Sequence, residues 1–320
     1  MIKVSVIIPA YNGDRFIGEA IDGILAQTYT DYEIIVVDDG STDNTRQVVK
    51  QYGDQIKYLS QTNQGVAASR NLGLKVSQGE YVAFLDQDDV FLPRKLASQV
   101  ALLEQNPSLG MVNSGWQIVN EQGEVEAAVQ PWQHIPNLSL ADLIVWKPVF
   151  LGAMLFRAAW LKRSPGFDTS LEQTPDVDLV LRLVAMGCTA AWVEQTTVKY
   201  RQHEANASNN TLLQTQELDQ IVTRFFAQSN LPPKVKALEA KSRCQTLIWS
   251  AWRLYQTGHL TKMNYYLYQS WFHSPKYPTK IIFNWIKSFK NYSAEYGKEF
   301  DVLSLTSSLE WQNLMQKCIF

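Results

Sequence analysis

Hydrophobic positions in the first hundred residues alternate between two kinds of spacing, which predicts strands alternating with helices. Short continuous apolar runs are typical of strands covered on both faces, and apolar residues three or four positions apart are typical of helices. The predicted strands cover residues 3–9, 33–37, 56–59 and 81–85. The predicted helices cover residues 15–27, 43–51, 65–76 and 94–104. This order predicts an α/β fold with a doubly wound, mostly parallel sheet.

The pattern changes after about residue 210, where helical spacing replaces the alternation. Long helices are predicted over residues 212–228 and 235–255, with Pro232 and Pro233 marking the break between them. We therefore predict two domains, an α/β domain over residues 1–209 and a helical C-terminal extension over residues 210–320.

The spacing of lysines and apolar residues over 276–292 predicts an amphipathic helix with a basic side and an apolar side. The lysines on one side are Lys276, Lys280, Lys287 and Lys290, and the apolar residues opposite them are Ile281, Ile282, Trp285, Ile286, Phe289 and Tyr292. Only Phe283 falls among the lysines. One interpretation is peripheral contact with an anionic membrane. The other is packing against the helix's own domain or against a second copy in a homodimer.

Charge is distributed unevenly between the two predicted domains. Residues 1–209 carry 16 Lys and Arg against 24 Asp and Glu, whereas residues 210–320 carry 13 against 7. The acidic first domain and the lack of a recognised motif argue against a nucleic-acid partner. The three cysteines are far apart and form no C-x-x-C pair, which fits a reducing cytosol. We expect a cytoplasmic protein, at the inner face of the plasma membrane if residues 276–292 bind lipid.

Polar clusters follow three of the predicted strands, at residues 9–12, 38–43 and 86–89. Ligands in such folds bind outside the carboxyl ends of the strands. The last cluster, Asp86, Asp88 and Asp89, packs three carboxylates into four residues, and these repel one another unless a cation lies between them. Mg²⁺ and Mn²⁺ take such oxygen ligands together with substrate phosphates, although a solvated acidic turn is the alternative. No G-x-G-x-x-G follows the first strand, which argues against a dinucleotide fold.

With these residues assembled, the chain resembles the family 2 glycosyltransferases, which are inverting sugar transferases with a GT-A fold. The resemblance covers about residues 2–209. It rests on six segments in order: VSVIIPAYN at 4–12, VVDDGSTD at 36–43, NQGVAASRN at 63–71, FLDQDD at 84–89, DVDLVLRL at 176–183 and YRQH at 200–203.

The resemblance implies a nucleotide site with seven residues: Pro9, Ala10, Tyr11, Asp38, Asp39, Arg70 and Asp86. In this scheme Asp39 pairs with the base, typically uracil, and Asp38 supports it. Arg70 faces the nucleotide or its diphosphate, and Asp86 lies near the ribose.

The resemblance also implies a metal site and a catalytic base. Asp88, in the D-x-D motif, would bind Mg²⁺ or Mn²⁺ together with His203, and Arg201 and His203 would contact the diphosphate. Asp176 would be the general base at the start of a helix. Pro175 stands where the family usually has Glu, and a purely structural N-terminal helix charge is the alternative for Asp176.

The expected function is transfer of a sugar from a nucleotide-diphosphate sugar, most simply a UDP-sugar, to a hydroxyl of a glycan or lipid-linked acceptor. Polysaccharide or glycolipid synthesis in the cell envelope is the usual setting for such proteins. Two alternatives stay open. One is a non-catalytic sugar-nucleotide-binding protein, and the other is a nucleotidyltransferase, which would usually carry a Gly-rich basic loop near its first strand.

Overall fold

The computed structural model describes residues 2–274 and 278–319 of the 320-residue chain. These residues form two compact units. The first unit comprises the chain up to Leu140 together with Pro148–His203, and the second comprises Ala141–Lys147 together with the chain from Glu204 onward. Nothing in the sequence pattern indicated that Ala141–Lys147 packs with the C-terminal helices. The roles assigned above to the two predicted domains stay predictions.

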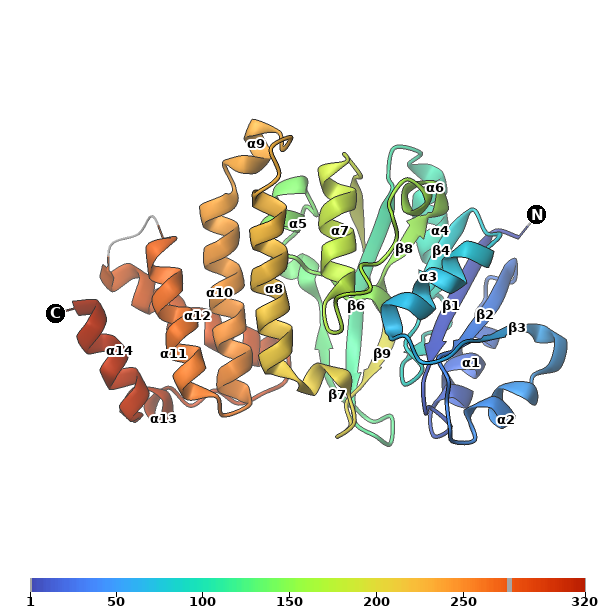
Figure 1. The fold of residues 1–320 in the computed structure, drawn as a ribbon, viewed down its shortest axis with the longest axis horizontal. Helices are drawn as coiled ribbons and strands as arrows, with labels where there is room; N and C mark the ends of the chain where they lie inside the picture. The colour runs from blue at the N-terminus through green and yellow to red at the C-terminus, as the bar shows by residue number, and fades with distance from the viewer. Residues whose placement is uncertain (1, 275–277, 320) are drawn as a thin grey trace. The chain divides into compact units, whose positions relative to one another are not determined.

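The first unit is built on a mixed sheet of nine strands within the described part of the chain (Figure 1). The strands are β1 Val4–Ala10, β2 Tyr32–Asp38, β3 Ile56–Ser60, β4 Tyr81–Phe84, β5 Val90–Phe91, β6 Met111–Val119, β7 Val125–Val129, β8 Leu155–Arg157 and β9 Ala190–Arg201. Their order is β3-β2-β1-β4-β8-β6-β9-β5, and β7 pairs with β6.

Strands β1 to β4 form the parallel half of this sheet, which confirms the predicted alternation. Every residue of β1 is buried, as expected of a central strand covered on both faces. The helices of the first half of the chain are α1 Ile17–Leu25, α2 Thr45–Lys50, α3 Val66–Val76 and α4 Lys95–Gln105. Each lies within the predicted range or within one residue of it.

The other half of the sheet was not predicted. Strand β6 pairs antiparallel with β7 and β8 but parallel with β9, and β9 also pairs antiparallel with the two-residue strand β5. Two helices interrupt this region, namely α6 Ala158–Lys162 and α7 Pro175–Ala185, while α5 Leu140–Val145 belongs to the second unit apart from its first residue. These pairings join segments that are far apart in sequence, so the local spacing of apolar residues cannot predict them.

The second unit is helical, as predicted for the C-terminal part. Its helices are α8 Thr211–Phe226, α9 Pro233–Lys236, α10 Glu239–Gln256, α11 Leu260–Phe272, α12 Pro278–Glu295, α13 Val302–Ser307 and α14 Leu309–Ile319. The single helix predicted over 235–255 is therefore wrong at its start, where the chain forms α9 and then α10. Helix α11 was not anticipated, because its tyrosines and tryptophan blur the contrast between its buried and exposed sides.

The apolar side of α12 packs into the core of its own unit. Ile281, Trp285 and Phe289 are each at most 1% exposed, and the indole Nε1 of Trp285 donates to Ser270 Oγ at 2.9 Å. The apolar side of α12 therefore packs within its own domain, which is one of the two interpretations given above for residues 276–292. Lys276 lies outside the described residues. Among the described helices, none is long and apolar enough to cross a membrane.

Candidate active site

Three strand ends meet at one edge of the sheet, as the strand order requires. Strand β1 lies between β2 and β4, so the point where the chain reverses its direction of winding falls beside β1. The Asp39 amide donates to the carbonyl of Ala10 at 2.7 Å, and the Leu85 amide donates to the carbonyl of Ile7 at 3.0 Å. The predicted clusters after β1, β2 and β4 are therefore neighbours in space.

Gln87, the middle residue of the D-x-D motif, links the ends of β1 and β4. Its Oε1 accepts from the Tyr11 amide at 2.9 Å, and its Nε2 donates to the Tyr11 carbonyl at 2.9 Å. A Cβ on Gly13 would lie 2.1 Å from Gln87 Oε1, so the glycine leaves room for this amide. The sequence analysis did not single out Gln87. Its side-chain amide has both a donor and an acceptor, and a residue of this kind between two aspartates can hydrogen-bond to a neighbouring backbone through both atoms.

Asp38 is 3% exposed and holds the turn that follows β2. One carboxylate oxygen accepts from the Ser41 amide at 2.8 Å and the other accepts from the Tyr58 hydroxyl at 2.5 Å. Burial raises the pKa of Tyr58 above its usual range, and the bond to Asp38 raises it further. Asp38 therefore holds this turn, and its expected role in supporting Asp39 at a nucleotide base stays a prediction.

Asp39 is also 3% exposed, and it fixes the loop before α3. Its carboxylate accepts from Gln61 Nε2 at 2.6 Å, from the Gln64 amide at 2.9 Å and from the Gly65 amide at 2.7 Å. An ionised carboxylate has about four lone-pair positions, so one stays available for a donor on a ligand. The loop at Gln61–Gly65 therefore belongs to the candidate site. The sequence had indicated it only through the segment NQGVAASRN, which begins at Asn63.

Arg70 and Asp86 form an ion pair beside these loops. Arg70 Nη2 lies 2.6 Å from Asp86 Oδ1, with side-chain exposures of 7% and 40%. The Nε of Arg70 is buried and has no hydrogen-bond partner among the described residues. A buried guanidinium N–H without an acceptor fits a site that receives an anionic ligand.

Asp176 lies in the first turn of α7, directly after Pro175. Its Oδ1 accepts from the Val177 amide at 2.8 Å. Burial raises the pKa of Asp176 to about 6, Arg70 opposes this rise, and the negative charge of Asp86 adds to it. Asp176 therefore lies within electrostatic reach of the Arg70–Asp86 pair, although the sequence separates them by about a hundred residues.

Asp88, in the turn between β4 and β5, and His203, just after β9, are brought together. Asp88 Oδ2 lies 2.9 Å from His203 Nε2, with side-chain exposures of 20% and 11%. The His203 ring packs on Phe16, with ring centroids 5.0 Å apart. No group of three or more His, Cys, Asp or Glu side chains is placed to hold a metal ion in the part of the chain that the structure describes.

Asp89, in the turn before β5, contacts Arg201 at the end of β9. Asp89 is 1% exposed and accepts from the Arg201 amide at 3.0 Å. Burial raises the pKa of Asp89 well above its usual range, and the nearby charges of Asp88 and Asp86 add to the effect. The Arg201 side chain is itself 1% exposed and donates to Glu19 Oε2 at 2.5 Å, to the Asp88 carbonyl at 3.0 Å and to the Glu121 carbonyl at 2.7 Å.

Comparisons with known proteins identify the family of this chain. The model of glycosyl transferase family 2 matches residues 5–151. An uncharacterised glycosyltransferase of Rickettsia typhi is 33% identical over 229 residues, which cover 70% of this chain and 71% of that protein. The chain belongs to glycosyltransferase family 2.

Solved structures resemble this glycosyltransferase along most of its length. The S. aureus protein TarS, residues 1–349 in complex with UDP-GlcNAc, matches with a TM-score of 0.64 at 19% identity and covers 95% of both chains. The mannosyltransferase PcManGT from Pyrobaculum calidifontis, in complex with GDP-Man and Mn²⁺, matches with the same TM-score and identity and covers 99% of this chain and 87% of its own. The predicted GT-A-like fold is confirmed.

One relative carries a specific activity in its name. The Escherichia coli protein WfgD is a UDP-Glc:α-D-GlcNAc-diphosphoundecaprenol β-1,3-glucosyltransferase, and it is 37% identical over 130 residues. The match covers 40% of this glycosyltransferase and 51% of WfgD.

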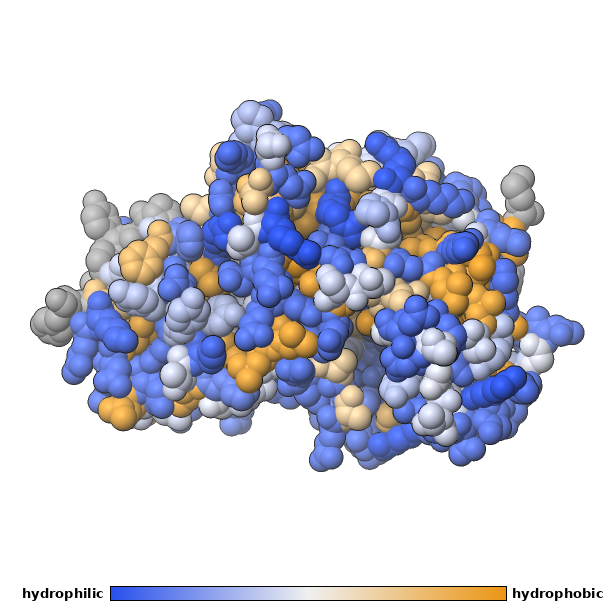
Figure 2. All heavy atoms as spheres, viewed as in Figure 1, coloured by the Kyte–Doolittle hydropathy of each residue, from blue (hydrophilic) through white to orange (hydrophobic). Residues whose placement is uncertain are grey.

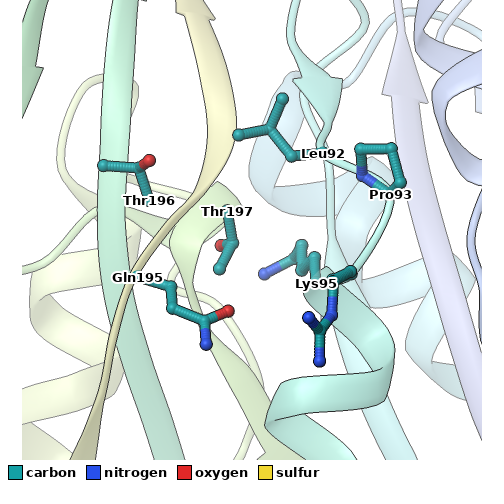
Figure 3. Close-up of a pocket in the computed structure, with 7 residues that line it drawn as sticks. Leu92, Pro93, Lys95, Gln195, Thr196 and Thr197 are labelled. Carbon is teal, nitrogen blue, oxygen red and sulfur yellow. The ribbon is translucent and has the colours of Figure 1, made fainter.

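A cavity of about 380 Å³ lies in the first unit beside the β5–β9 pairing (Figure 3). It is lined by Leu92, Pro93, Arg94, Lys95, Gln195, Thr196 and Thr197. Lys95 is fully buried, and its Nζ donates to Gln99 Oε1 at 2.8 Å. None of the predicted site residues belongs to this lining.

Proposed function

We propose that this glycosyltransferase moves a sugar, with inversion, from a UDP-sugar to a hydroxyl of a glycan or lipid-linked acceptor. The setting would be synthesis of a cell-envelope polysaccharide or glycolipid. Tyr11, whose side chain is 47% exposed next to the Gln87 amide, would cover the base together with Pro9 and Ala10. Asp39 would accept a hydrogen bond from the base at its remaining lone pair.

The observation that carries this proposal is the position of Asp176, in the first turn of α7 and within electrostatic reach of the Arg70–Asp86 pair. A general base works best when its pKa lies near the working pH, and the pKa of Asp176 is raised to about 6. Asp176 would take the proton from the acceptor hydroxyl as that oxygen attacks the anomeric carbon. Pro175 occupies a first-turn position where its ring suits the helix, so the helix that presents Asp176 is preserved.

The diphosphate would lie between Arg70 and His203. The buried Nε of Arg70 provides a donor that no described protein group accepts. Arg201, by contrast, is committed to Glu19 and to two backbone carbonyls. We therefore assign Arg201 a positioning role, holding the turn that carries Asp88, in place of the direct diphosphate contact predicted from the sequence.

Asp88 and His203 fit a divalent metal as one oxygen and one nitrogen ligand. Mg²⁺ usually takes oxygen ligands only, so this mixed pair favours Mn²⁺, with the other positions filled by donor phosphates and water. When bound, the metal would act as a Lewis acid that neutralises the charge developing on the departing nucleoside diphosphate. The Mn²⁺ in the PcManGT complex and the UDP-GlcNAc in the TarS complex support this donor and metal class. The name of WfgD supports a lipid-linked acceptor.

Calorimetric titration of UDP, GDP and CDP, with and without Mn²⁺, tests the donor and metal sites. We expect Mn²⁺-dependent UDP binding in the wild type and its loss in Asp88→Ala. Asp54→Ala is the matched control, because Asp54 is an exposed aspartate of the same unit outside the site. Binding that is equal in Asp88→Ala and wild type would refute the metal assignment.

Turnover is measured separately, as UDP release from a panel of UDP-sugars and as the anomeric configuration of the product by NMR. UDP binding without turnover of any sugar would favour a non-catalytic sugar-nucleotide-binding protein. Retention of configuration would refute the inverting mechanism.

A further inference from the structure

Asn71, on α3 directly after Arg70, holds a segment from a distant part of the first unit. Its side-chain Oδ1 accepts from the Phe167 amide at 2.8 Å, and its Nδ2 donates to the Phe167 carbonyl at 2.8 Å. Figure 2 shows apolar residues gathered over α3, and hydrogen bonds in such surroundings are stronger than in water. One side-chain amide thus satisfies both backbone groups of Phe167 and joins α3 to the loop that precedes α7.

This loop is shaped to receive the amide of Asn71. Gly166 has a φ of +82°, in the left-handed region that favours glycine, and a Cβ there would lie 2.5 Å from Asn71 Oδ1. The carbonyl of Gly166 accepts from Arg182 Nη2 at 2.7 Å. Two helices therefore fix consecutive residues of the loop, α3 through Asn71 and α7 through Arg182.

The ring of Phe167 supports the Arg70–Asp86 pair. The ring is 3% exposed, and the Arg70 guanidinium lies over it, 5.6 Å from the centroid. Phe84, the last residue of β4, packs edge-to-face on the same ring, with centroids 5.2 Å apart. Asp86 follows two residues later and pairs with Arg70. Phe167 thus contacts Arg70 directly and also the strand that leads to Asp86.

We propose that Asn71 is a positioning residue for the donor: by holding Phe167 beneath Arg70, it keeps the Arg70 guanidinium aligned with the donor diphosphate. This role rests on the proposed function, in which the buried Nε of Arg70, a donor that no described protein group accepts, binds that diphosphate. A displaced Arg70 would also affect the proposed base. The charge of Arg70 opposes the rise in the pKa of Asp176, so this pKa would rise further without it.

Asn71→Leu tests the proposal, because it removes both hydrogen bonds at similar side-chain volume. The Kd of UDP in the presence of Mn²⁺ should rise about tenfold, since a hydrogen bond from a charged group to the diphosphate is weakened. Carbon-13 NMR of aspartate-labelled protein without donor should show the pKa of Asp176 moving upward from about 6. A residue needed only for folding would change stability and neither of these properties.

Gln27→Leu is the matched control for the lost amide. Gln27 is a buried amide of the same unit that also joins distant backbone groups. Its Nε2 donates to the Leu92 carbonyl at 2.9 Å, and its Oε1 accepts from the Leu96 amide at 3.0 Å. This variant should lose stability as Asn71→Leu does, with wild-type UDP binding and a wild-type titration of Asp176.

Gly166→Ala disturbs the same contact from the other side, and it serves if Asn71→Leu does not fold. Its new Cβ displaces the Asn71 amide, so both changes should appear again. Gly187→Ala is its control. Gly187 has a φ of +92°, so alanine strains the backbone there as well, but the Cβ points into open space. Gly187→Ala should leave UDP binding and the titration of Asp176 unchanged.

A double-mutant cycle tests whether Asn71 acts through Phe167. Phe167→Leu removes the ring beneath Arg70 and keeps the backbone groups that Asn71 contacts. Asn71→Leu should therefore change the Kd of UDP and the pKa of Asp176 less in Phe167→Leu than in the wild type.

Three results would overturn the proposal. They are unchanged UDP binding and titration in Asn71→Leu, equal changes in Gln27→Leu, and additive effects in the cycle. A wild type that does not bind UDP would instead refute the proposed donor site. The titration of Asp176 needs no donor, so it would still decide whether Asn71 positions Arg70.

Discussion

Asp176 combines a cost to folding with the proposed role of general base. Its pKa is raised from an ordinary 3.8 to about 6, so the folded protein holds the charged form less readily than the unfolded chain does. The resulting cost to stability is absent below about pH 4, where the carboxyl is protonated in both states. It grows as the pH rises to about 6 and is complete above that value. A residue that serves only as an N-terminal helix charge would not be expected to carry such a cost.

Asp176→Asn should therefore lose activity and gain stability. Removing a general base lowers kcat about 10²- to 10⁴-fold. At pH 7 the free energy of unfolding should rise by about 1 to 3 kcal/mol, because Asn keeps the neutral shape that the site favours. In the wild type, kcat/KM should fall about tenfold per pH unit below pH 6.

Urea unfolding of both proteins at pH 4, 5, 6 and 7, together with initial rates, measures these effects. The difference in stability should be near zero at pH 4 and reach its plateau above pH 6. Full activity in Asp176→Asn, or a stability difference that does not change with pH, would refute the assigned base and its environment.

At the scale of elements, the end of β9 organises the turn between β4 and β5. Arg201 is the last residue of β9, and it reaches the carbonyl of Asp88 and the carbonyl of Glu121 from a buried position. The Arg201 guanidinium also lies over the Phe16 ring at 4.8 Å. The proposed metal ligands, Asp88 and His203, thus depend on a strand that is remote from Asp88 in sequence.

Arg201→Met should destabilise the fold by about 2 to 4 kcal/mol, because it removes a buried guanidinium that donates to two partly buried carbonyls. It should also weaken Mn²⁺-dependent UDP binding. Glu19→Gln removes the other half of the ion pair but should cost less than about 1 kcal/mol, because the Glu19 side chain is 59% exposed. Thermal unfolding and UDP titrations over a range of Mn²⁺ concentrations measure both variants. If Arg201→Met instead keeps wild-type stability and has a higher KM for the donor, the result would support the direct contact between Arg201 and the diphosphate that the sequence predicts.

The same strand shows where reasoning from sequence stops. Strands β1 to β4 and helices α1 to α4 could be predicted because their apolar spacing is local. The pairing of β6 with β9, and of β9 with β5, could not, because no local pattern encodes contacts between such distant segments. The candidate site divides in the same way. Asp39, Asp86 and Asp88 could be predicted because they follow strands and belong to recognisable motifs. Gln87 and Glu19 could not, because their roles depend on contacts with Tyr11 and Arg201 that only the fold creates.

For the whole molecule, the proposed chemistry belongs to one of the two units. All residues assigned to the nucleotide, the metal and the base lie in the first unit, and so do Asn71 and Phe167. The second unit buries Ile281, Trp285 and Phe289 in a core of its own.

Donor binding should therefore protect the first unit selectively. A ligand at 100 times its Kd stabilises the state that binds it by about 2.7 kcal/mol, which slows hydrogen exchange through unfolding of that unit about 100-fold. With UDP and Mn²⁺, peptides covering residues 9–13, 38–43, 61–70 and 86–91 should show this slowing. Peptides from α10 and α11 should exchange at unchanged rates.

Hydrogen exchange followed by mass spectrometry makes this comparison, and Asp88→Ala serves as the control that should show no slowing in either unit. Equal protection of both units by UDP and Mn²⁺ would mean that they unfold together. In that case the donor would not stabilise the first unit independently of the second.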